Sequence, residues 1–314
     1  MRYGERSVLN QANHIKQLVI LSGKGGTGKT SISAAIADLA YSSQKQVHAV
    51  MVDADVDAAN LSLVLQPKIS ETREFWGGSV AEIDKSKCIG CDLCKSLCRY
   101  DAIIPYADGS NTYFVDPIAC DGCAACVYSC ASEAIRMIPQ QEGNWFHSQT
   151  GYGDLFHAEL FPGKENSGKL VTLIKQNARL WAEDTQASLL VVDGPPGIGC
   201  PVISTCAGAD LGLIVTEPSV AAIHDYKRIL NLLRHFKIPV IVCINKSDIY
   251  PDGVENIRQY SSSQGIEILG EIPYDEHITQ AMVQGKPVTN KYPKSSASRV
   301  IQEIWDKIVY RLSK

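Results

Sequence analysis

Eight cysteines stand in two runs of the same spacing, and thiolates placed in this way can ligate metals. The first run extends from Cys88 to Cys98 as C-x-x-C-x-x-C-x-x-x-C, and it recurs 32 positions later from Cys120 to Cys130. The flanking residues recur as well: Asp84 as Asp116, and Ala102-Ile103 as Ala134-Ile135. A duplication that keeps every cysteine predicts a pair of metal centres in one small module.

The doubled spacing is typical of bacterial ferredoxins with two 4Fe–4S clusters, in which the fourth cysteine of each run ligates the other cluster. The pattern predicts one cluster on Cys88, Cys91, Cys94 and Cys130, and a second on Cys98, Cys120, Cys123 and Cys126. Arg99 and Ala131 stand where a proline commonly follows the fourth cysteine. This departure bears on the local turn and the reduction potential, and leaves the ligands unchanged.

Zinc is the alternative metal, because pairs of C-x-x-C also build tetrahedral zinc sites. A zinc site does not need the third and fourth cysteines that follow here, twice over, at fixed spacing. We do not expect the eleven cysteines to form disulfides. Disulfides are typical of proteins in oxidising compartments, and the N-terminus lacks the apolar region of a signal peptide that would direct the chain there. The pattern therefore favours iron–sulfur clusters.

A glycine-rich segment near the N-terminus has the composition of a phosphate-binding loop. It follows an apolar run, 15–21, and contains G-x-x-x-x-G-K-[ST] from Gly23 to Thr30. Glycines let successive backbone N–H groups face an anion, and the following helix adds its positive end. The expected nucleotide-binding residues are Gly23, Lys24, Gly25, Gly26, Thr27, Gly28, Lys29 and Thr30. Lys29 is expected on the β- and γ-phosphates, and the Thr30 hydroxyl on Mg²⁺.

The same glycines also satisfy G-x-G-x-x-G, the turn of dinucleotide-binding domains. That motif requires an acidic residue about 20 positions further on. The first candidates, Asp53 and Asp55, come later than that, and the motif leaves Lys29-Thr30 without a role. We therefore prefer the P-loop interpretation.

Two apolar stretches end in aspartates, at the point where parallel strands present residues to ligands. Asp53 and Asp55 follow the stretch 47–52, and Asp193 follows 188–192. A solvated acidic loop and an ordinary Pro-Gly turn are the alternatives without function. Given the P-loop, we interpret the first pair as part of a switch loop and Asp193 as the Walker B aspartate that supports Mg²⁺.

The segment from Lys24 to Thr30, K-G-G-x-G-K-T, resembles the deviant Walker A motif of the MinD/Mrp-like ATPases, which include the nitrogenase iron protein. The resemblance implies that two subunits enclose two nucleotides, with Lys24 reaching the partner's phosphates. It implies a catalytic set of Lys24, Lys29, Asp55 and Asp193, in which Asp55 handles the attacking water. Asp53 then joins Thr30 on the magnesium side, and the Gly197 N–H senses the γ-phosphate.

Asn245-Lys246-Ser247-Asp248 follows a strand and resembles the N-K-x-D loop with which GTPases read the base. The MinD/Mrp resemblance implies adenine with Asn245 retained, whereas Asp248 leaves guanine open. A plain turn is the remaining alternative.

Three further cysteines stand outside the two runs. Cys200 lies seven residues past Asp193, the offset at which the nitrogenase iron protein holds a shared cluster. No other cysteine clearly matches the second ligand that such a cluster needs, so we prefer a packing role for Cys200. Cys206 and Cys243 lie in apolar runs and are expected in the core.

Strands and helices alternate outside the cysteine module. The expected strands are 15–21, 47–52, a pair over 145–161, 188–192, 211–215, 240–244 and 266–272; the expected helices are 29–42, 166–182, 219–236, 253–263 and one over 300–312. This order predicts a doubly wound, mostly parallel α/β P-loop NTPase domain, 1–79 and 141–314, with an inserted α+β ferredoxin-like domain carrying two 4Fe–4S clusters, 80–140.

Composition restricts the partners and the compartment. The formal charge of −4 gives no basic excess, so nucleic-acid binding is not predicted. No apolar run approaches the roughly 18 residues of a spanning helix, and we expect a cytoplasmic protein. The last helix carries an apolar stripe over 300–312, as the membrane-binding helix of MinD does. Without a basic run beside it, core packing is preferred.

These observations together predict a dimeric Mg-ATP-hydrolysing protein, as a homodimer or a heterodimer with a related ATPase, coupled to two 4Fe–4S clusters. Our first hypothesis for the coupling is ATP-gated electron transfer to a partner metalloenzyme. A carrier or scaffold for iron–sulfur clusters is the second hypothesis, and a spatial regulator of the MinD kind is the third.

Overall fold

The computed structural model describes residues 14–42, 47–164 and 167–314. The chain divides into two compact units. The main unit comprises residues up to Arg73, Asn144–Leu160 and the chain from Ser167 onward, and the inserted unit comprises Glu74–Gly143 and Phe161–Asn166. The insertion expected over 80–140 lies within the longer of these two segments.

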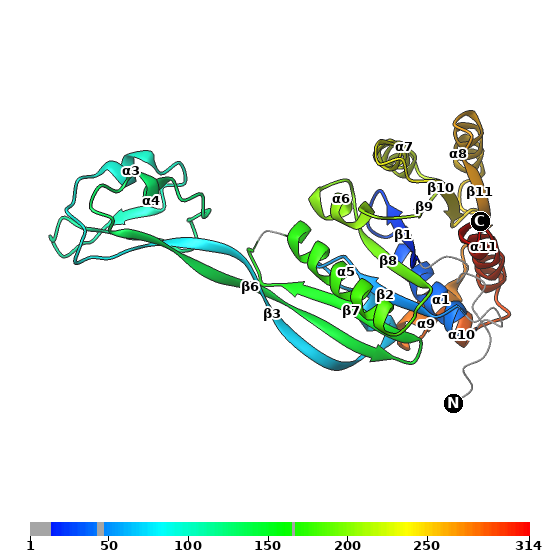
Figure 1. Ribbon diagram of the computed structural model, residues 1–314. Coiled ribbons are helices and arrows are strands. Elements are labelled where there is room, and N and C mark those ends of the chain that lie inside the picture. Colours follow the sequence, from blue (N-terminus) through cyan, green and yellow to red (C-terminus); the bar gives the residue numbers. More distant parts are fainter. Residues whose placement is uncertain (1–13, 43–46, 165–166) are drawn as a thin grey trace. The chain divides into compact units, whose positions relative to one another are not determined.

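A nine-stranded sheet of the order β11-β10-β9-β1-β8-β2-β7-β6-β3 runs through the main unit (Figure 1). The strands that pair in parallel are β1 (Lys16–Ser22), β2 (Ala49–Asp53), β7 (Gly153–Leu160), β8 (Leu189–Pro196), β9 (Leu211–Thr216), β10 (Val240–Asn245) and β11 (Glu267–Ile272). Buried on both faces, they read in the sequence as continuous apolar runs.

Helices cover both faces of this sheet (Figure 1). One core lies under α1 (Lys29–Ser42), α2 (Leu61–Leu65), α9 (Glu276–Val283), α10 (Val288–Lys291) and α11 (Ser296–Leu312). Another core lies under α6 (Cys200–Cys206), α7 (Val220–His235) and α8 (Pro251–Ser263), and α5 (Ser167–Asp184) packs against α6. Successive residues of β1 alternate between the two cores, Leu18 facing the first and Val19 the second. The predicted mostly parallel α/β fold is therefore correct for the main unit.

The central strand β1 has β8 on one side and β9 on the other. The chain passes from β1 to β2 on the β8 side, and later from β8 to β9 on the opposite side of β1. In open α/β sheets ligands bind at the carboxyl ends of the strands at such a switch point. The loop after β1 is the predicted P-loop. Asp53 is the last residue of β2, Asp55 follows it, and Asp193 lies within β8 opposite Asp53. The fold thus brings all three segments to one edge of the sheet.

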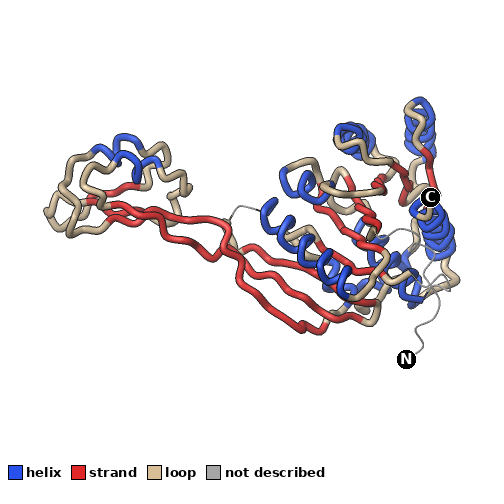
Figure 2. Tube along the Cα trace, in the orientation of Figure 1, coloured by secondary structure: helices blue, strands red, loops and turns tan. Residues whose placement is uncertain are grey.

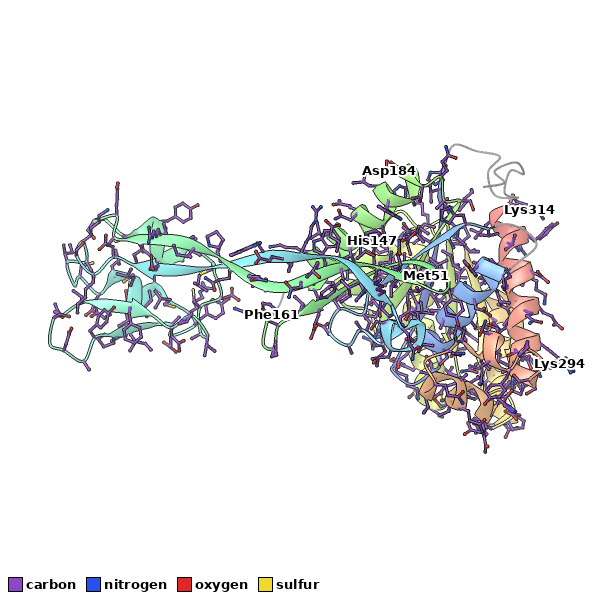
Figure 3. The ribbon with its side chains drawn as sticks, turned by 90° about the horizontal axis from the view of Figure 1, so that it is seen from below. Met51, His147, Phe161, Asp184, Lys294 and Lys314 are labelled. Atoms are coloured by element: carbon purple, nitrogen blue, oxygen red, sulfur yellow. The ribbon has the colours of Figure 1, made fainter. Side chains whose placement is uncertain are left out.

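The last helix packs into the core, as expected. Its buried residues are Ala297, Ser298, Ile301, Ile304, Trp305, Ile308, Val309 and Leu312. Figure 3 labels Lys294 and Lys314, which flank this helix at its two ends, and Met51, which belongs to the buried strand β2. No helix among the described residues is both long and apolar enough to cross a membrane.

The inserted unit repeats its structure with the period of its sequence (Figure 2). Its two short helices, α3 (Leu93–Leu97) and α4 (Ala125–Ser129), occupy equivalent positions of the repeat. The hairpin strands β4 (Ile103–Pro105) and β5 (Tyr113–Val115) are equivalent to the start of β6 (Ile135–Thr150) and the end of β3 (Lys68–Ile83).

The strands β3 and β6 differ from the sequence-based expectation. We expected the returning strand pair to begin near residue 145, but β6 begins at Ile135, and β3 was not expected at all. Both strands extend over 16 residues and pair with each other. Much of β3 is polar and half-buried or exposed, so it lacks the apolar run from which the other strands were recognised.

Candidate functional site

The P-loop joins β1 to α1 through a turn that depends on its glycines. Gly26 and Gly28 have φ of 79° and 90°, which other residues rarely adopt. A Cβ at Gly28 would lie 2.2 Å from Asn245 Nδ2, and one at Gly23 would lie 2.1 Å from Asp225 Cβ. The loop therefore needs glycine both for its conformation and for the close approach of neighbouring elements.

Lys29 and Thr30, the first residues of α1, meet the Walker B aspartate. Lys29 Nζ lies 2.6 Å from Asp193 Oδ1, and the Thr30 hydroxyl donates to Asp193 Oδ2 at 3.0 Å. Ser33, one turn further along α1, donates to Asp193 Oδ1 at 2.8 Å. Asp193 is fully buried, so this group of donors satisfies a carboxylate that would otherwise be costly to bury.

Asp53 lies beside Asp193, because the two residues are register partners on the adjacent strands β2 and β8. It is fully buried and accepts the backbone N–H groups of Asp55 and Leu61 at 3.2 and 3.0 Å. Burial, and then repulsion from Asp193, raise the pKa of Asp53. The carboxylates of Asp53 and Asp193 and the Thr30 hydroxyl place hard oxygen atoms side by side, which is the kind of ligand that Mg²⁺ prefers. A bound cation would relieve the repulsion between the two carboxylates.

Asp55 lies in the wall of the cleft over the P-loop, and burial raises its pKa. Gly197 follows the end of β8 with φ of 92°. Its N–H, expected to sense a phosphate, donates to the Ser22 carbonyl at 3.2 Å in this structure.

Lys24, the additional lysine of the P-loop, is paired within its own chain. Its Nζ lies 2.6 Å from Glu217 Oε1 and donates to Ser219 Oγ at 3.2 Å. The other Glu217 oxygen lies 2.8 Å from Lys246 Nζ, which also donates to the Gly26 carbonyl. Burial opposes ionisation of Glu217, but the two lysines outweigh it and hold the pKa of this carboxyl below its usual range.

A cleft of about 690 Å³ opens over the P-loop. The residues from Lys24 to Ser31 line it, and an apolar part of its wall consists of Leu63, Val64, Pro273, Tyr274, Ile278, Met282 and Val283. Asn245 lies in the same wall and donates from Nδ2 to the Thr27 carbonyl at 2.8 Å. Asn245 Oδ1 and Thr27 Oγ1 are buried without a hydrogen-bond partner in the described part of the chain. Unpaired polar atoms beside an apolar wall fit a ligand with a phosphate end and a base.

Asn245 and Asp248, the first and last residues of the N-K-x-D segment, contact different parts of the site. Asn245 faces the P-loop, whereas Asp248 Oδ1 accepts the backbone N–H of Tyr274 at 2.7 Å. Asp248 therefore holds the loop that carries Tyr274, one of the residues in the apolar wall.

In the inserted unit the eight cysteines line two separate cavities. The first sulfur cavity is lined by Cys88, Cys91, Cys94 and Cys130, and the second by Cys98, Cys120, Cys123 and Cys126. The fourth cysteine of each run thus lies with the first three of the other run. Besides burial, the groups that raise the pKa of Cys94 are the thiols of Cys88, Cys91 and Cys130.

The thiols surround these cavities without converging on a point. No three His, Cys, Asp or Glu side chains in the described ranges lie close enough to hold one metal ion. Cys91 and Cys123 are the exposed members of the two sets, while the rest are half-buried or buried. Cys206 and Cys243 are buried, as expected for core residues. Cys200, for which the sequence favoured a packing role, is instead exposed at the start of α6.

Two residues of the site were not found from the sequence. Glu217 follows β9, and Ser33 lies on α1. The position of Glu217 directly after a strand adjacent to β1 is the one signal that could have indicated it.

Comparisons with known proteins agree with this geometry. The CobQ/CobB/MinD/ParA nucleotide binding domain matches residues 18–288. An uncharacterized protein of Methanocaldococcus jannaschii is 32% identical over 294 residues, which cover 94% of this chain and 96% of that protein. An iron-sulfur cluster carrier protein of Aquifex aeolicus is 28% identical over 127 residues, 37% of this chain and 35% of the carrier. The septum site-determining protein MinD of Pyrococcus horikoshii, solved with Mg-ADP, superimposes with a TM-score of 0.57 at 16% identity, covering 94% of this chain and 96% of that one. The chain is therefore a P-loop ATPase that belongs to the CobQ/CobB/MinD/ParA family.

Proposed function

We propose that this ATPase works as a dimer, that its inserted unit carries two 4Fe–4S clusters, and that ATP gates the passage of electrons from these clusters to a partner metalloenzyme. The observation that carries the proposal is the crossed arrangement of the cysteines around two cavities. Crossed sets of four thiols are the ligands that two-cluster ferredoxins use.

In the ATP site the residues neutralise and position charge. Lys29 and the P-loop N–H groups bind the phosphates, and Thr30, Asp53 and Asp193 hold Mg²⁺ directly or through water. When bound, Mg²⁺ supplies charge neutralisation and orientation of the phosphate oxygens. Asp55, at the cleft wall, orients the attacking water, and Lys24 reaches across the dimer to the partner's phosphates.

In the inserted unit the cysteines hold and insulate a redox group. When bound, a 4Fe–4S cluster stores and releases one electron at a time. The residues Ile83, Ile103, Tyr113 and Ile135 form the core between the thiols, and beside this core Cys94 is buried and five other cysteines are half-buried. Cys91 and Cys123 are exposed, so each cavity has one edge at which a redox partner can approach.

Chain connectivity provides the coupling between the two sites. Asp53 accepts the N–H of Leu61, the first residue of α2, and β3 follows α2 and leads into the inserted unit. A switch loop that reorganises on binding the γ-phosphate therefore pulls on the start of β3. ATP can shift the behaviour of the clusters only by its difference in affinity for the two arrangements.

The test compares the clusters in two nucleotide states. Anaerobically purified protein is titrated potentiometrically with EPR detection in Mg-ADP and in Mg with a non-hydrolysable ATP analogue, in the presence of the physiological partner once that is identified by co-purification. We expect the potentials, or the rates of quenching by a small oxidant, to differ between the states. A Lys24→Ala variant, which binds nucleotide as a single subunit, should lose this difference. Equal potentials and equal rates with confirmed analogue binding would contradict the gating.

A second candidate function is that of an iron–sulfur cluster carrier. The similarity to the Aquifex aeolicus carrier protein supports it, although it covers only 37% of this chain. A carrier must give up its clusters, whereas an electron-transfer protein must retain them. Incubation with a chelator and with an apo-ferredoxin acceptor separates the two, since loss of iron to the acceptor would favour the carrier.

A further inference from the structure

The two sulfur cavities are lined by equivalent positions of the 32-residue repeat but differ in side chains. The equivalent pairs that change most in polarity or size, with the residue of the first cavity given first, are Ile89 and Asp121, Leu93 and Ala125, Tyr113 and Ala81, and Ser132 and Tyr100. Each cavity is therefore a variant of the same site, and the differences change what surrounds the thiols.

The two cavities differ in the hydrogen bonds to the sulfur of the crossed fourth cysteine. Cys130 Sγ lies 3.4 Å from the Ser132 hydroxyl and accepts the Ala134 N–H at 3.3 Å. The equivalent cysteine of the second cavity is Cys98, and its sulfur accepts no hydrogen bond from any described residue. Elsewhere in the second cavity the Ala81 N–H donates to Cys120 Sγ at 3.5 Å. The backbone N–H of Val127 bonds to the Cys126 sulfur, as that of Lys95 does to Cys94 in the first cavity.

The two cavities also differ in charge, because a carboxylate lines the second cavity and not the first. Asp121 follows Cys120 directly and lines the second cavity, where the first has the apolar Ile89. The first run contains a carboxylate as well, Asp92. Each of the two carboxylates meets a tyrosine hydroxyl, Asp92 that of Tyr113 and Asp121 that of Tyr100, but only Asp121 is among the residues that line its cavity.

We propose that the two clusters have different reduction potentials, the higher in the first cavity, and that Ser132 and Asp121 are the side chains that separate them. Reduction adds one negative charge to an already anionic cluster. Donors on a ligand sulfur stabilise that charge, and a carboxylate at the cavity wall repels it. A protein that has taken up one electron therefore holds it in the first cavity, with the second cluster oxidised. This inference rests on the proposed presence of two clusters.

The experiment is a potentiometric titration of the full-length, cluster-loaded protein with dithionite, followed by EPR. Two reduction steps are expected in the wild type. Ser132→Ala should lower the higher of the two potentials, and Asp121→Asn should raise the lower one. Each variant should therefore reduce the difference between the two reduction potentials. Cys91→Asp and Cys123→Asp, each altering a ligand of one cavity, identify which EPR signal belongs to which cluster.

Two matched variants serve as controls. Ser129→Ala makes the same change in the first cavity, but that hydroxyl donates to the Cys126 carbonyl at 3.1 Å and not to a sulfur. Asp101→Asn removes a carboxylate of the same unit that lines neither cavity. Both should leave the two potentials unchanged.

Iron and acid-labile sulfide are measured on every sample before titration. Protein purified anaerobically without either would overturn both this inference and the proposed function. Protein with two clusters of equal potential, or with the higher potential in the second cavity, would overturn this inference and leave the proposed clusters in place. Shifts in the controls as large as those in Ser132→Ala and Asp121→Asn would also overturn it.

Discussion

Lys24 and Glu217 form an ion pair of 2.6 Å within one subunit, between the P-loop and the loop after β9. Glu217 forms ion pairs with two lysines, because Lys246 binds its second carboxylate oxygen. Our proposal places Lys24 on the phosphates of a partner subunit. Dimerisation with ATP therefore requires Lys24 to leave Glu217, and the intact pair opposes dimerisation by its own free energy.

We expect Glu217→Gln to strengthen ATP-dependent dimerisation. The Lys24 side chain is 35% exposed, so the pair contributes only about 0.5–1 kcal/mol, which corresponds to roughly a two- to fivefold change in the dimer dissociation constant. Analytical ultracentrifugation with a non-hydrolysable ATP analogue measures this. Glu255→Gln, which removes a carboxylate paired with Arg258 on α8, is the control. Weaker dimerisation in Glu217→Gln would mean that this carboxylate is needed in the dimer.

Lys24→Ala should abolish ATP-dependent dimerisation and hydrolysis while a single subunit still binds nucleotide, because the loop's glycines and Lys29 remain. Fluorescent nucleotide binding, sedimentation and phosphate release measure the three properties separately. Lys286→Ala, which alters a lysine outside the P-loop, is the control. Normal turnover by Lys24→Ala would refute the cross-subunit role.

Asp55→Ala should bind ATP and dimerise, but hydrolyse at least about a hundredfold more slowly, since positioning by a general base contributes a factor of this order. The stalled dimer should be visible by sedimentation with ATP itself. Hydrolysis at the wild-type rate would show that Asp55 does not handle the attacking water.

The residues predicted from the sequence belong to motifs whose parts are close in the chain or fixed by strand ends. The P-loop and the cysteine runs are local patterns, and Asp53 and Asp193 were found because each directly follows an apolar run in the sequence. The pairing of Lys24 with Glu217 joins segments far apart in sequence, and nothing local marks it. The strand β3 escaped prediction for a different reason, since its edge position leaves most of its side chains half-buried or exposed and removes the apolar signal.

Burial of His157 should make the main unit less stable in acid. The residue bonds to the Ser148 hydroxyl at 2.9 Å, and burial lowers the pKa of its imidazole to about 4 from 6.5. Between these values the unfolded chain binds a proton that the folded chain does not, so stability rises with pH. The contribution present above pH 6.5 is lost as the pH falls, by about 2 kcal/mol at pH 5.

The matched measurement is urea unfolding at pH 7.5 and pH 5. His157→Gln keeps a hydrogen-bonding group beside Ser148, and its free energy of unfolding should fall less between the two pH values than that of the wild type. His224→Gln, at a histidine on the surface of α7 whose side chain is 72% exposed, should behave like the wild type. If the free energy of unfolding of His157→Gln fell with pH as much as that of the wild type, His157 would not be the cause of the loss of stability in acid.

Double cysteine variants test the crossed ligation. With both clusters the protein should contain about eight iron and eight sulfide. Cys98→Ser combined with Cys123→Ser alters one cavity twice, and should keep about four iron. Cys98→Ser combined with Cys91→Ser alters both cavities, and should keep almost none. The reverse result would mean that each run serves its own cluster, and stoichiometric zinc without sulfide would refute the iron–sulfur interpretation.

The inserted unit leaves and rejoins the main chain through the paired strands β3 and β6, where Arg73 lies over the Trp145 ring at 5.5 Å. An insertion whose two ends are neighbours can be gained or lost in a single genetic event, because a short hairpin turn closes the gap that remains. The two units also have separate cores, so oxidation of the thiols in the inserted unit does not by itself remove a contact from the core that supports the nucleotide-binding loop.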